Sequence, residues 1–384
     1  MSRQLKTAAV NRVAVIGAGP AGSLAAIRLA QSGFDTTLIE QKTFPRDKVC
    51  GECLSSLGLQ TLSSHGLLGL LEQAGLHTLS RGQIHGQDDA TFSMPLPVAM
   101  GGITRRTMDQ TLLTRARDAG ATILQPVRCE GRTETSLTLR SLDTNQVSRH
   151  EFDLVVQADG KPRDGAKPTH QFGIKTHFRN IELDPGAIHL FSTGGTYGGI
   201  ARVEDGLWNA AFVVNAGDLK LAGGDVGRLF ESTVALSPQL ARAMRFSTHA
   251  GAWVSCPLPR YSVARQWPVG VIPLGNAAAA LEPIGGEGMG LALASSSLAV
   301  DEIIRARDES RPINVGQLRT QFGRLWRTRR AACRACAVAL SHPKLANFAV
   351  DFISAIPSIQ GLILKSVGKS AAGPATVPAT VPAI

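Results

Sequence analysis

Three glycines near the amino terminus, in the segment Gly17-Ala18-Gly19-Pro20-Ala21-Gly22, have the spacing of a loop that holds phosphate. In such a loop one glycine permits a tight turn, one lets the backbone approach a diphosphate, and one lets a helix pack closely on a strand. The amide N–H groups at the start of the following helix then face the phosphates. Glu40 follows the third glycine by 18 positions, a separation suited to a carboxylate that binds a ribose. These residues predict a dinucleotide site.

The sequence around this loop supplies the elements that the site needs. The apolar run from Val13 to Ile16 predicts a buried strand, and Ser23 to Ser32 predicts a helix that Gly33 ends. A second strand is expected from Asp35 to Ile39. Strand, glycine loop, helix, strand and acid together form one βαβ unit.

Two later parts of the chain also show the alternation of short apolar strands and helices that is typical of a parallel sheet. A helix is expected after Thr104, with Thr107 and Gln110 as a capping box and Gly120 as its end. Short strands are expected over 121–124, 151–158 and 270–274. The strand expected over 270–274 is followed by Gly275-Asn276-Ala277 and then by a glycine-rich segment, 283–290. A long helix is expected to begin in this segment and to extend through Ile304.

Four motifs resemble those of the FAD-dependent oxidoreductases with the aromatic-hydroxylase fold, a family that includes geranylgeranyl reductases, flavin monooxygenases and flavin halogenases. They are the glycine loop with Glu40, the segment Phe44 to Leu54 with its F-P-R-x-K-x-C-G pattern, the arginines after Thr104, and the paired turns at 275–277 and 283–288. The segment 153–160, which ends in Asp159-Gly160, is similar to the family's D-G motif.

The resemblance implies FAD as cofactor, with the arginine role after Thr104 carried to Arg106 rather than Arg105. Asn276 stands where the family has an acid, and Lys161-Pro162-Arg163 departs from the family's Ser and Arg, so NAD(P)H as electron donor stays open. The FAD-binding residues implied are Gly17, Ala18, Gly19, Pro20, Ala21, Gly22, Glu40, Gln41, Arg46, Cys50, Arg106, Val127, Asp159, Gly160, Gly275, Asn276, Pro283, Gly285, Gly286, Glu287, Gly288 and Met289.

Between residues 170 and 214 the pattern changes to alternating, turn-punctuated segments typical of an antiparallel sheet. We therefore expect an α/β fold in which a Rossmann-like FAD-binding domain (8–60, 101–165 and 264–310) is interrupted by a substrate domain (61–100 and 166–263) with a mostly antiparallel β-sheet. C-terminal helices over 311–369 and a disordered tail over 370–384 complete the expected organisation.

The charge and amino-acid composition of the chain favour some classes of binding partner and argue against others. The 384 residues carry a net charge of +10, which attracts phosphorylated or carboxylated ligands, an acidic carrier or protein substrate, or anionic lipid. No apolar run is long enough to span a membrane, so we expect a cytoplasmic protein with peripheral membrane contact still open. Only two tyrosines are present and the arginine-rich helix lacks interleaved aromatics, which argues against nucleic acid. The two C-x-x-C pairs, Cys50/Cys53 and Cys333/Cys336, have simpler roles than a metal site.

The resemblance implies a monooxygenase that hydroxylates or epoxidises an apolar or aromatic substrate through a flavin C4a-hydroperoxide. A geranylgeranyl-reductase-like saturase of prenyl double bonds, a flavoprotein that modifies a partner protein, and a non-catalytic flavin-binding module remain alternatives. The substrate wall is expected on the antiparallel sheet, which offers Phe191, Tyr197, Trp208 and Phe212. Because the loop of Glu52 passes the expected flavin ring, this residue is the candidate catalytic group.

Overall fold

The computed structural model describes residues 10–86, 90–160, 170–259, 261–264, 266–342, 344–348, 352, 357–366 and 368–369. Two of the sequence predictions concern residues outside these ranges, namely Lys161-Pro162-Arg163 and the tail after residue 369. Within them, no helix is both long and apolar enough to cross a membrane.

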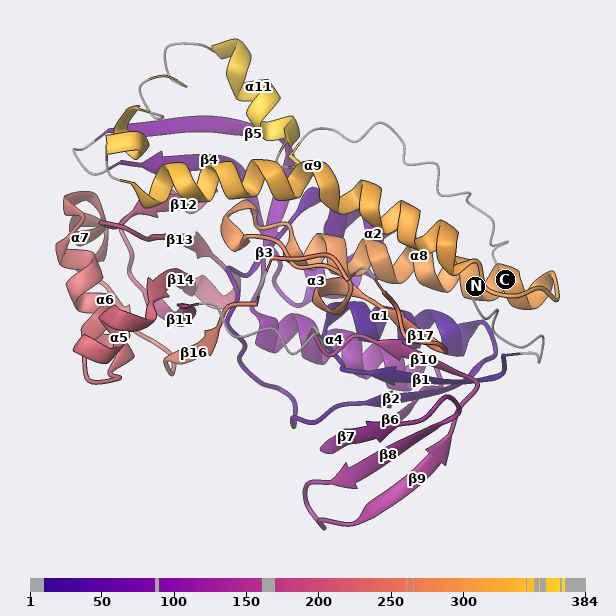
Figure 1. Ribbon diagram of the computed structural model, residues 1–384. Coiled ribbons are helices and arrows are strands. Elements are labelled where there is room, and N and C mark those ends of the chain that lie inside the picture. Colours follow the sequence, from indigo (N-terminus) through magenta and orange to yellow (C-terminus); the bar gives the residue numbers. More distant parts are fainter. Residues whose placement is uncertain are drawn as a thin grey trace.

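The first layer of the fold is a five-stranded parallel sheet (Figure 1). Its order is β17 (Val271–Pro273), β10 (Leu154–Gln157), β1 (Arg12–Ile16), β2 (Asp35–Ile39) and β6 (Thr122–Leu124). Along β1 the side chains alternate between two cores, as strand geometry requires. Val13 and Val15 pack with helices α1 (Pro20–Gln31), α4 (Arg105–Asp118) and α8 (Gly288–Asp308), while Ala14 and Ile16 face the other side.

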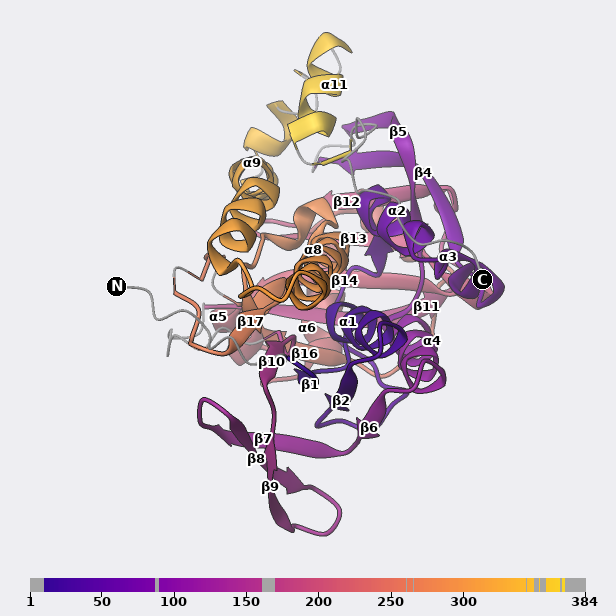
Figure 2. The same ribbon diagram turned by 90° about the vertical axis from the view of Figure 1, so that its right-hand side faces the viewer.

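A separate three-stranded sheet covers that other side. It consists of β7 (Val127–Arg132), β8 (Ser136–Ser141) and β9 (Val147–Glu151), and it projects from the body of the molecule (Figure 2). Leu137 and Leu139 of β8 are fully buried against β1 and its neighbours.

The sheet of the expected substrate domain has nine strands. Its path runs β15 (Thr248–His249), β11 (Gln171–Arg179), β14 (Trp208–Asn215), β13 (Tyr197–Arg202), β12 (Ala187–Ser192), β4 (His77–His85), β5 (Thr91–Gly102) and β3 (Cys53–Leu54), and β16 (Val254–Pro257) pairs with β11. All its pairs are antiparallel except β12 with β4. Helices α5 (Ala216–Leu221), α6 (Val226–Ala235) and α7 (Pro238–Met244) accompany it, with a short turn η1 (Glu204–Gly206).

Helix α9 (Val315–Ser341) links the two domains, because it contacts α8 on one side and β12 and β13 on the other (Figure 1). Two single turns, η2 (Gly275–Ala277) and η3 (Pro283–Gly285), precede α8, and α11 (Pro357–Ser366) lies against α9. Helices α2 (Ser56–Ser64) and α3 (Leu68–Gln73) and the turn between them contribute Leu62, Leu71 and Leu67 to the core shared by α1 and α8. The expected domain boundary at residue 61 therefore falls within α2.

The expected fold class, an α/β domain with a parallel sheet interrupted by a domain with a mostly antiparallel sheet, is confirmed. The predicted capping box is wrong: Thr104 is the cap of α4 and its hydroxyl accepts a hydrogen bond from Thr107 N at 3.1 Å. The Gln110 side chain instead donates to Thr114 on the helix surface. The sheet β7–β9 and helices α5 to α7 were not foreseen, since their segments are largely polar or short.

Candidate cofactor and substrate site

The glycine loop has the close backbone approaches that its sequence predicts. Gly17 has a φ of 98°, and a Cβ placed there would lie 2.7 Å from the carbonyl oxygen of Ala158 at the end of β10. A Cβ on Gly22 would overlap the carbonyl oxygen of Gly17, so α1 can meet β1 only through glycine. Gly19, by contrast, leaves its Cβ position open apart from one arginine nitrogen at 3.6 Å. The loop thus offers bare backbone at the start of α1, as a diphosphate requires.

Glu40 lies beside this loop at the end of β2. Its carboxylate is buried and accepts hydrogen bonds from Ala18 N at 2.9 Å and Lys42 N at 2.8 Å. The Glu40 carbonyl accepts from Val127 N at 2.7 Å, and Gln41 beside it is half-buried. The structure therefore brings Glu40, Gln41 and Val127 to the edge of the loop where a ribose and an adenine would extend.

Three cations gather at the mouth of the loop. Arg105, buried as the first residue of α4, is the arginine near Gly19 and forms a bidentate pair with Asp109, at 2.8 Å and 2.6 Å. Arg46 stacks on Phe44 at 4.5 Å and lies 3.7 Å from Asp109. Burial, opposed by Asp109, lowers the pKa of Arg46.

Lys48 is the third cation, and the sequence reasoning did not assign it to the site. Its ammonium nitrogen lies 3.7 Å from the Cβ position of Gly160, beside Asp159. Its side chain is partly exposed to solvent, but protein atoms crowd around the amine, and this desolvation, with Arg105 and Arg46 nearby, lowers its pKa to about 8. A dinucleotide diphosphate would relieve this crowding of positive charge.

Arg106 is placed elsewhere. Its side chain is 54% exposed and pairs with Asp47 at 3.5 Å, away from the glycine loop. The structure therefore brings Arg105, not Arg106, to the position that the family resemblance assigned to Arg106.

The second turn system lies against the first. A Cβ on Gly275 would be 3.8 Å from the Cβ of Ala21 in α1, which joins η2 to the start of the glycine-loop helix. Asn276 is exposed on this turn. Gly286, at the end of η3, has a φ of 62° and faces Met100 and Cys53, while Gly285 is buried next to Cys333. Pro283, Gly288 and Met289 complete the turn and the start of α8.

The candidate catalytic residue Glu52 points away from this space. Its side chain is fully buried and accepts from Arg105 N at 2.8 Å, lies 2.9 Å from Lys175 Nζ, and bonds His177 Nε2 at 2.7 Å. Its loop neighbours Cys50, Gly51 and Cys53 do line the adjacent cavity, but Glu52 does not. Its partners indicate that Glu52 anchors the loop.

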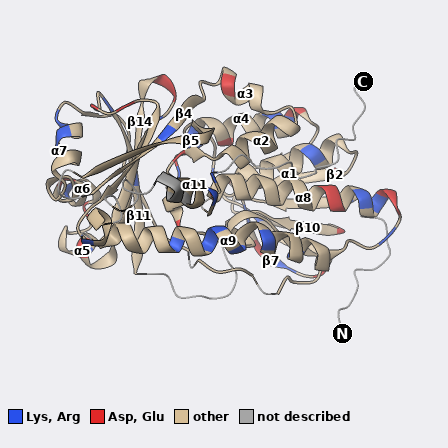
Figure 3. Cartoon of the chain, turned by 90° about the horizontal axis from the view of Figure 1, so that it is seen from above, with Lys and Arg blue, Asp and Glu red and all other residues tan. Residues whose placement is uncertain are grey.

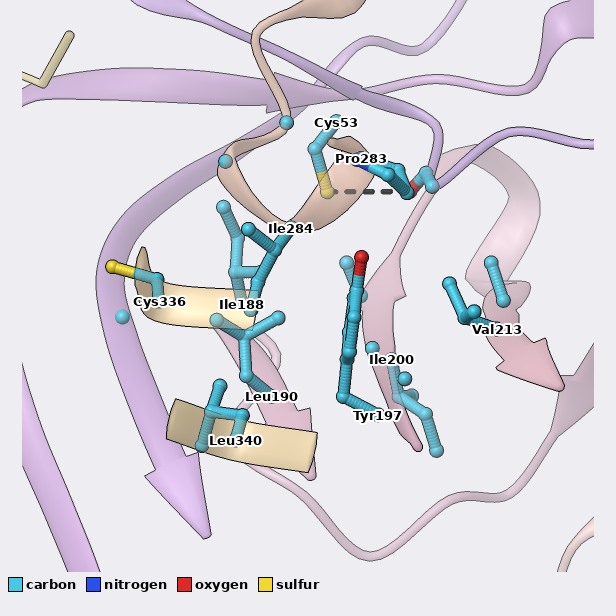
Figure 4. Close-up of a pocket in the computed structure, with 18 of the residues that line it drawn as sticks. Cys53, Ile188, Leu190, Tyr197, Ile200, Val213, Pro283, Ile284, Cys336 and Leu340 are labelled. Atoms are coloured by element: carbon cyan, nitrogen blue, oxygen red, sulfur yellow. Dashed lines mark hydrogen bonds between the residues drawn. The ribbon is translucent and has the colours of Figure 1, made fainter. Parts of the chain in front are cut away.

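A cavity of about 240 Å³ extends from the η3 turn into the substrate domain. Figure 4 shows side chains from β12, β13, η3 and α9 converging on it, with the Tyr197 hydroxyl on the side of Pro283. Of the expected wall residues, Tyr197 and Phe212 line it, whereas Phe191 and Trp208 pack in the core beneath the sheet. The wall is mainly apolar and includes Ile188, Leu190, Ile200, Val213, Ile284 and Leu340.

Two acids lie just behind the cavity wall. Glu282 accepts from Tyr197 Oη at 3.1 Å and from the largely exposed Arg334 at 3.0 Å. Glu287, which precedes α8, is buried and lies 3.3 Å from Lys369 Nζ and 3.6 Å from Arg329 Nε. Glu287 thus faces the C-terminal segment with its side chain, and only its backbone belongs to the turn.

Cys50, Cys53 and Cys336 line the same cavity, but the two C-x-x-C pairs come from different elements. Cys50 and Cys53 lie in the loop before α2, whereas Cys333 and Cys336 lie on α9, and all six cysteines are free thiols. Burial raises the pKa of both Cys53 and Cys333 to about 12, which keeps these thiols protonated. In the part of the chain that the structure describes, no group of three or more His, Cys, Asp or Glu side chains is arranged to hold a metal ion.

Comparison with known proteins agrees with this geometry. Residues 11–167 match the family model described as FAD binding domain. Residues 11–167 therefore form a domain that resembles this FAD-binding family. The residues present fit FAD, because the glycine loop offers a cradle that a Cβ would fill and Lys48 and Arg46 crowd positive charge beside it.

Curated proteins similar to this chain match different shares of it. The chain is 24% identical to conditioned medium factor receptor 1 of Dictyostelium discoideum, and the match covers 77% of the chain and 64% of that protein. It is 29% identical to menaquinone reductase of Mycolicibacterium smegmatis, and that match covers 41% of the chain and 38% of that protein. The chain thus spans less than two thirds of these first relatives. Digeranylgeranylglycerophospholipid reductase 2 of Methanopyrus kandleri is 25% identical over 77% of the chain and 78% of that protein.

Solved structures show the same fold. The flavin-dependent brominase Bmp2 superposes with a TM-score of 0.75 at 17% identity, covering 93% of each chain. A geranylgeranyl bacteriochlorophyll reductase-like protein from Thermoplasma acidophilum gives 0.72 at 18% identity, covering 94% of this chain and 97% of that one.

Proposed function

We propose that this FAD-dependent oxidoreductase is a reductase that saturates carbon–carbon double bonds in an apolar, isoprenoid-like chain. The observation that carries the proposal is the cavity beside the η3 turn, whose wall is formed mainly by aliphatic side chains from both domains. Such a wall binds a hydrocarbon by excluding water and has little to offer a polar substrate.

The relatives support reduction over oxygenation. The match to the digeranylgeranylglycerophospholipid reductase extends over most of both chains, beyond the residues of the FAD-binding domain model. The likeness to the brominase, at 17% identity, concerns the fold alone.

Residues of the chain account for binding and for the proton. Reduced FAD, if bound at this site, would be the source of the hydride that one carbon of the double bond needs. The adjacent carbon needs a proton, and we assign it to the hydroxyl of Tyr197, a residue that lines the cavity. Burial, together with the charge of Glu282, raises the pKa of Tyr197, so its hydroxyl stays protonated at neutral pH. The Tyr197 hydroxyl donates to Glu282, which also accepts from the exposed Arg334, so this chain of hydrogen bonds leads from the hydroxyl to solvent.

A second candidate is the monooxygenase that the sequence favoured, hydroxylating or epoxidising a similar substrate. The enclosed, mainly apolar cavity favours it, since exclusion of water protects reactive oxygen species from side reactions.

One experiment separates the two. The FAD-loaded protein is reduced with dithionite without oxygen and mixed with geranylgeraniol or geranylgeranyl diphosphate, and products are read by mass spectrometry. The reductase adds two hydrogens per double bond consumed and reoxidises the flavin without oxygen. Product that forms only in aerated buffer and contains one atom of labelled dioxygen would instead establish the monooxygenase.

A further inference from the structure

We propose that the C-terminal helices form a docking surface for an anionic phospholipid bilayer, from which the lipophilic substrate enters the cavity. The inference rests on the proposed function for the identity of the substrate, but its observations are separate. They are exposed apolar side chains, an excess of basic residues, and the position of the cavity wall on the same helices.

The apolar side chains form a group that we call the C-terminal apolar face, namely Val338, Leu345, Phe348, Phe352 and Leu362, with exposed fractions from 40% to 64%. Of the twelve large hydrophobic residues exposed in the described part of the chain, these five fall within 25 positions. Phe348 and Phe352 stack on each other with ring centroids 5.7 Å apart, outside the core. A soluble surface rarely concentrates large apolar side chains in this way without a partner.

The charge of the same segment is strongly positive. Residues 315–369 contain nine Lys and Arg and a single Asp, and no Glu. Figure 3 shows blue Lys and Arg bands along α9 with no red between them. Arg327, Arg330 and Arg334 on α9 are exposed, as are Lys344 and Lys365 that flank the apolar residues. Basic groups beside exposed Phe and Leu are the combination that places a helix in the interface of an anionic membrane.

The cavity lies directly beneath this face. Cys336 and Leu340 of α9 and Leu364 of α11 line the cavity, while Val338 and Leu362 on the same helices are exposed to solvent. Lys369, after α11, also lines it. In Figure 2, α11 stands beyond the end of α9 and next to β5, at the outer limit of the molecule. A bilayer in contact with these helices is therefore separated from the cavity by the helices α9 and α11 themselves.

The arrangement fits a lipid surface better than an acidic carrier protein. A carrier would be attracted by the same arginines, but the stacked phenylalanines are both exposed to solvent. Projecting aromatic and aliphatic side chains insert into the boundary between headgroups and acyl chains, and the proposed substrate is itself soluble in that layer.

Vesicle flotation tests the proposal with the full-length, FAD-loaded protein and no substrate. Vesicles of phosphatidylcholine and phosphatidylglycerol in equal parts are compared with vesicles of phosphatidylcholine alone. We expect flotation with the mixed vesicles and far less with the neutral ones, and loss of flotation at high salt because exposed charges are then screened.

Matched variants locate the contact. Phe348→Ser combined with Phe352→Ser, and Arg327→Glu combined with Arg330→Glu, should each lower the partition onto mixed vesicles by about tenfold or more. The apolar control is Leu221→Ser with Phe246→Ser, at 88% and 57% exposed positions on the substrate domain, and the charge control is Arg117→Glu on α4. Both controls should float like the wild type. Bound-flavin absorbance verifies that each variant is folded.

Each result of the flotation assay either supports or overturns the docking surface. A wild type that stays with the soluble fraction, or controls that lose flotation as fully as the test variants, overturns the docking surface. Retention of the wild type on immobilised acyl carrier protein, without flotation, shows that the face binds protein and also overturns it. Because the assay contains no substrate, failed flotation with intact prenyl reduction refutes the docking alone, while flotation without any prenyl reduction refutes the proposed reaction alone.

Discussion

The carboxylate of Glu52 lies 2.9 Å from the ammonium nitrogen of Lys175, and both side chains are fully buried between the FAD-binding loop and strand β11. Lys175 also lies 3.3 Å from Asp47, and His177 bonds the second oxygen of Glu52. Glu52 itself has a φ of 53°, an unfavourable conformation for a residue with a side chain. The ion pair therefore fixes the loop that carries Cys50 and Cys53 past the cavity.

Glu52→Gln tests this anchoring role. Removal of one partner leaves the charge of Lys175 poorly compensated, so we expect a loss of about 3–5 kcal/mol in the free energy of unfolding. Urea denaturation measures it, with the exposed Glu72→Gln as control. Pairing Glu52→Gln with Lys175→Met should recover part of the loss. A variant of wild-type stability with no turnover would instead restore Glu52 as an acid or base.

Lys48 makes FAD binding dependent on pH. Its pKa of about 8 without cofactor means that the amine is charged at pH 7 and neutral at pH 9. The diphosphate favours the charged form, so binding above pH 8 requires uptake of a proton, and affinity should fall by up to about tenfold per pH unit. Titration of the apoprotein with FAD by flavin fluorescence measures the slope. Lys48→Met should bind FAD more weakly at pH 7 and lose the slope. An unchanged slope would assign the effect to another group.

Arg105 and Arg106 provide an adjacent pair with opposite expectations. Arg105→Lys keeps a charge but loses the bidentate pair with Asp109, and it should weaken FAD binding by at least about tenfold. Arg106→Ala removes an exposed side chain and should change the affinity less than about twofold. The same fluorescence titration compares them. The reverse order of effects would support the assignment made from the sequence.

This pair also shows where sequence reasoning succeeds and fails. The βαβ unit could be predicted because the run from Val13 to Ile16 is buried on both faces and the glycines allow only one local geometry. The choice between two neighbouring arginines depended on the helix cap. With Thr104 as the cap, Arg105 becomes the first helical residue and turns inward, and its spacing of four to Asp109 was the signal available in the sequence.

The cavity could not be predicted in the same way. Its wall is assembled from β12, β13, η3 and α9, whose residues are far apart in the chain and show the same apolar patterns as ordinary core. The tertiary structure decides that Tyr197 and Phe212 line the cavity and that Phe191 and Trp208 do not.

Gly22→Ala tests the close approach of α1 and β1. The added methyl group would overlap the Gly17 carbonyl, so the loop must shift and FAD affinity should fall more than about tenfold. Gly69→Ala on α3, where a Cβ meets no atom within 4 Å, is the matched control and should bind FAD normally. Flavin content after purification and a titration of the apoprotein report the difference. Equal flavin content in both variants would show that α1 can adjust.

Tyr197→Phe tests the proposed proton donor. The change removes one hydroxyl from the cavity and leaves Glu282 paired with Arg334, so FAD binding and reduction by dithionite should stay as in the wild type. Because proton transfer by a positioned group contributes about 100-fold or more, turnover of the prenyl substrate should fall by a similar factor while the KM changes little. The control is Tyr261→Phe, whose hydroxyl lies outside the cavity wall. A loss confined to KM, or a solvent isotope effect unchanged between Tyr197→Phe and wild type, would show that Tyr197 only shapes the wall and that the proton comes from elsewhere.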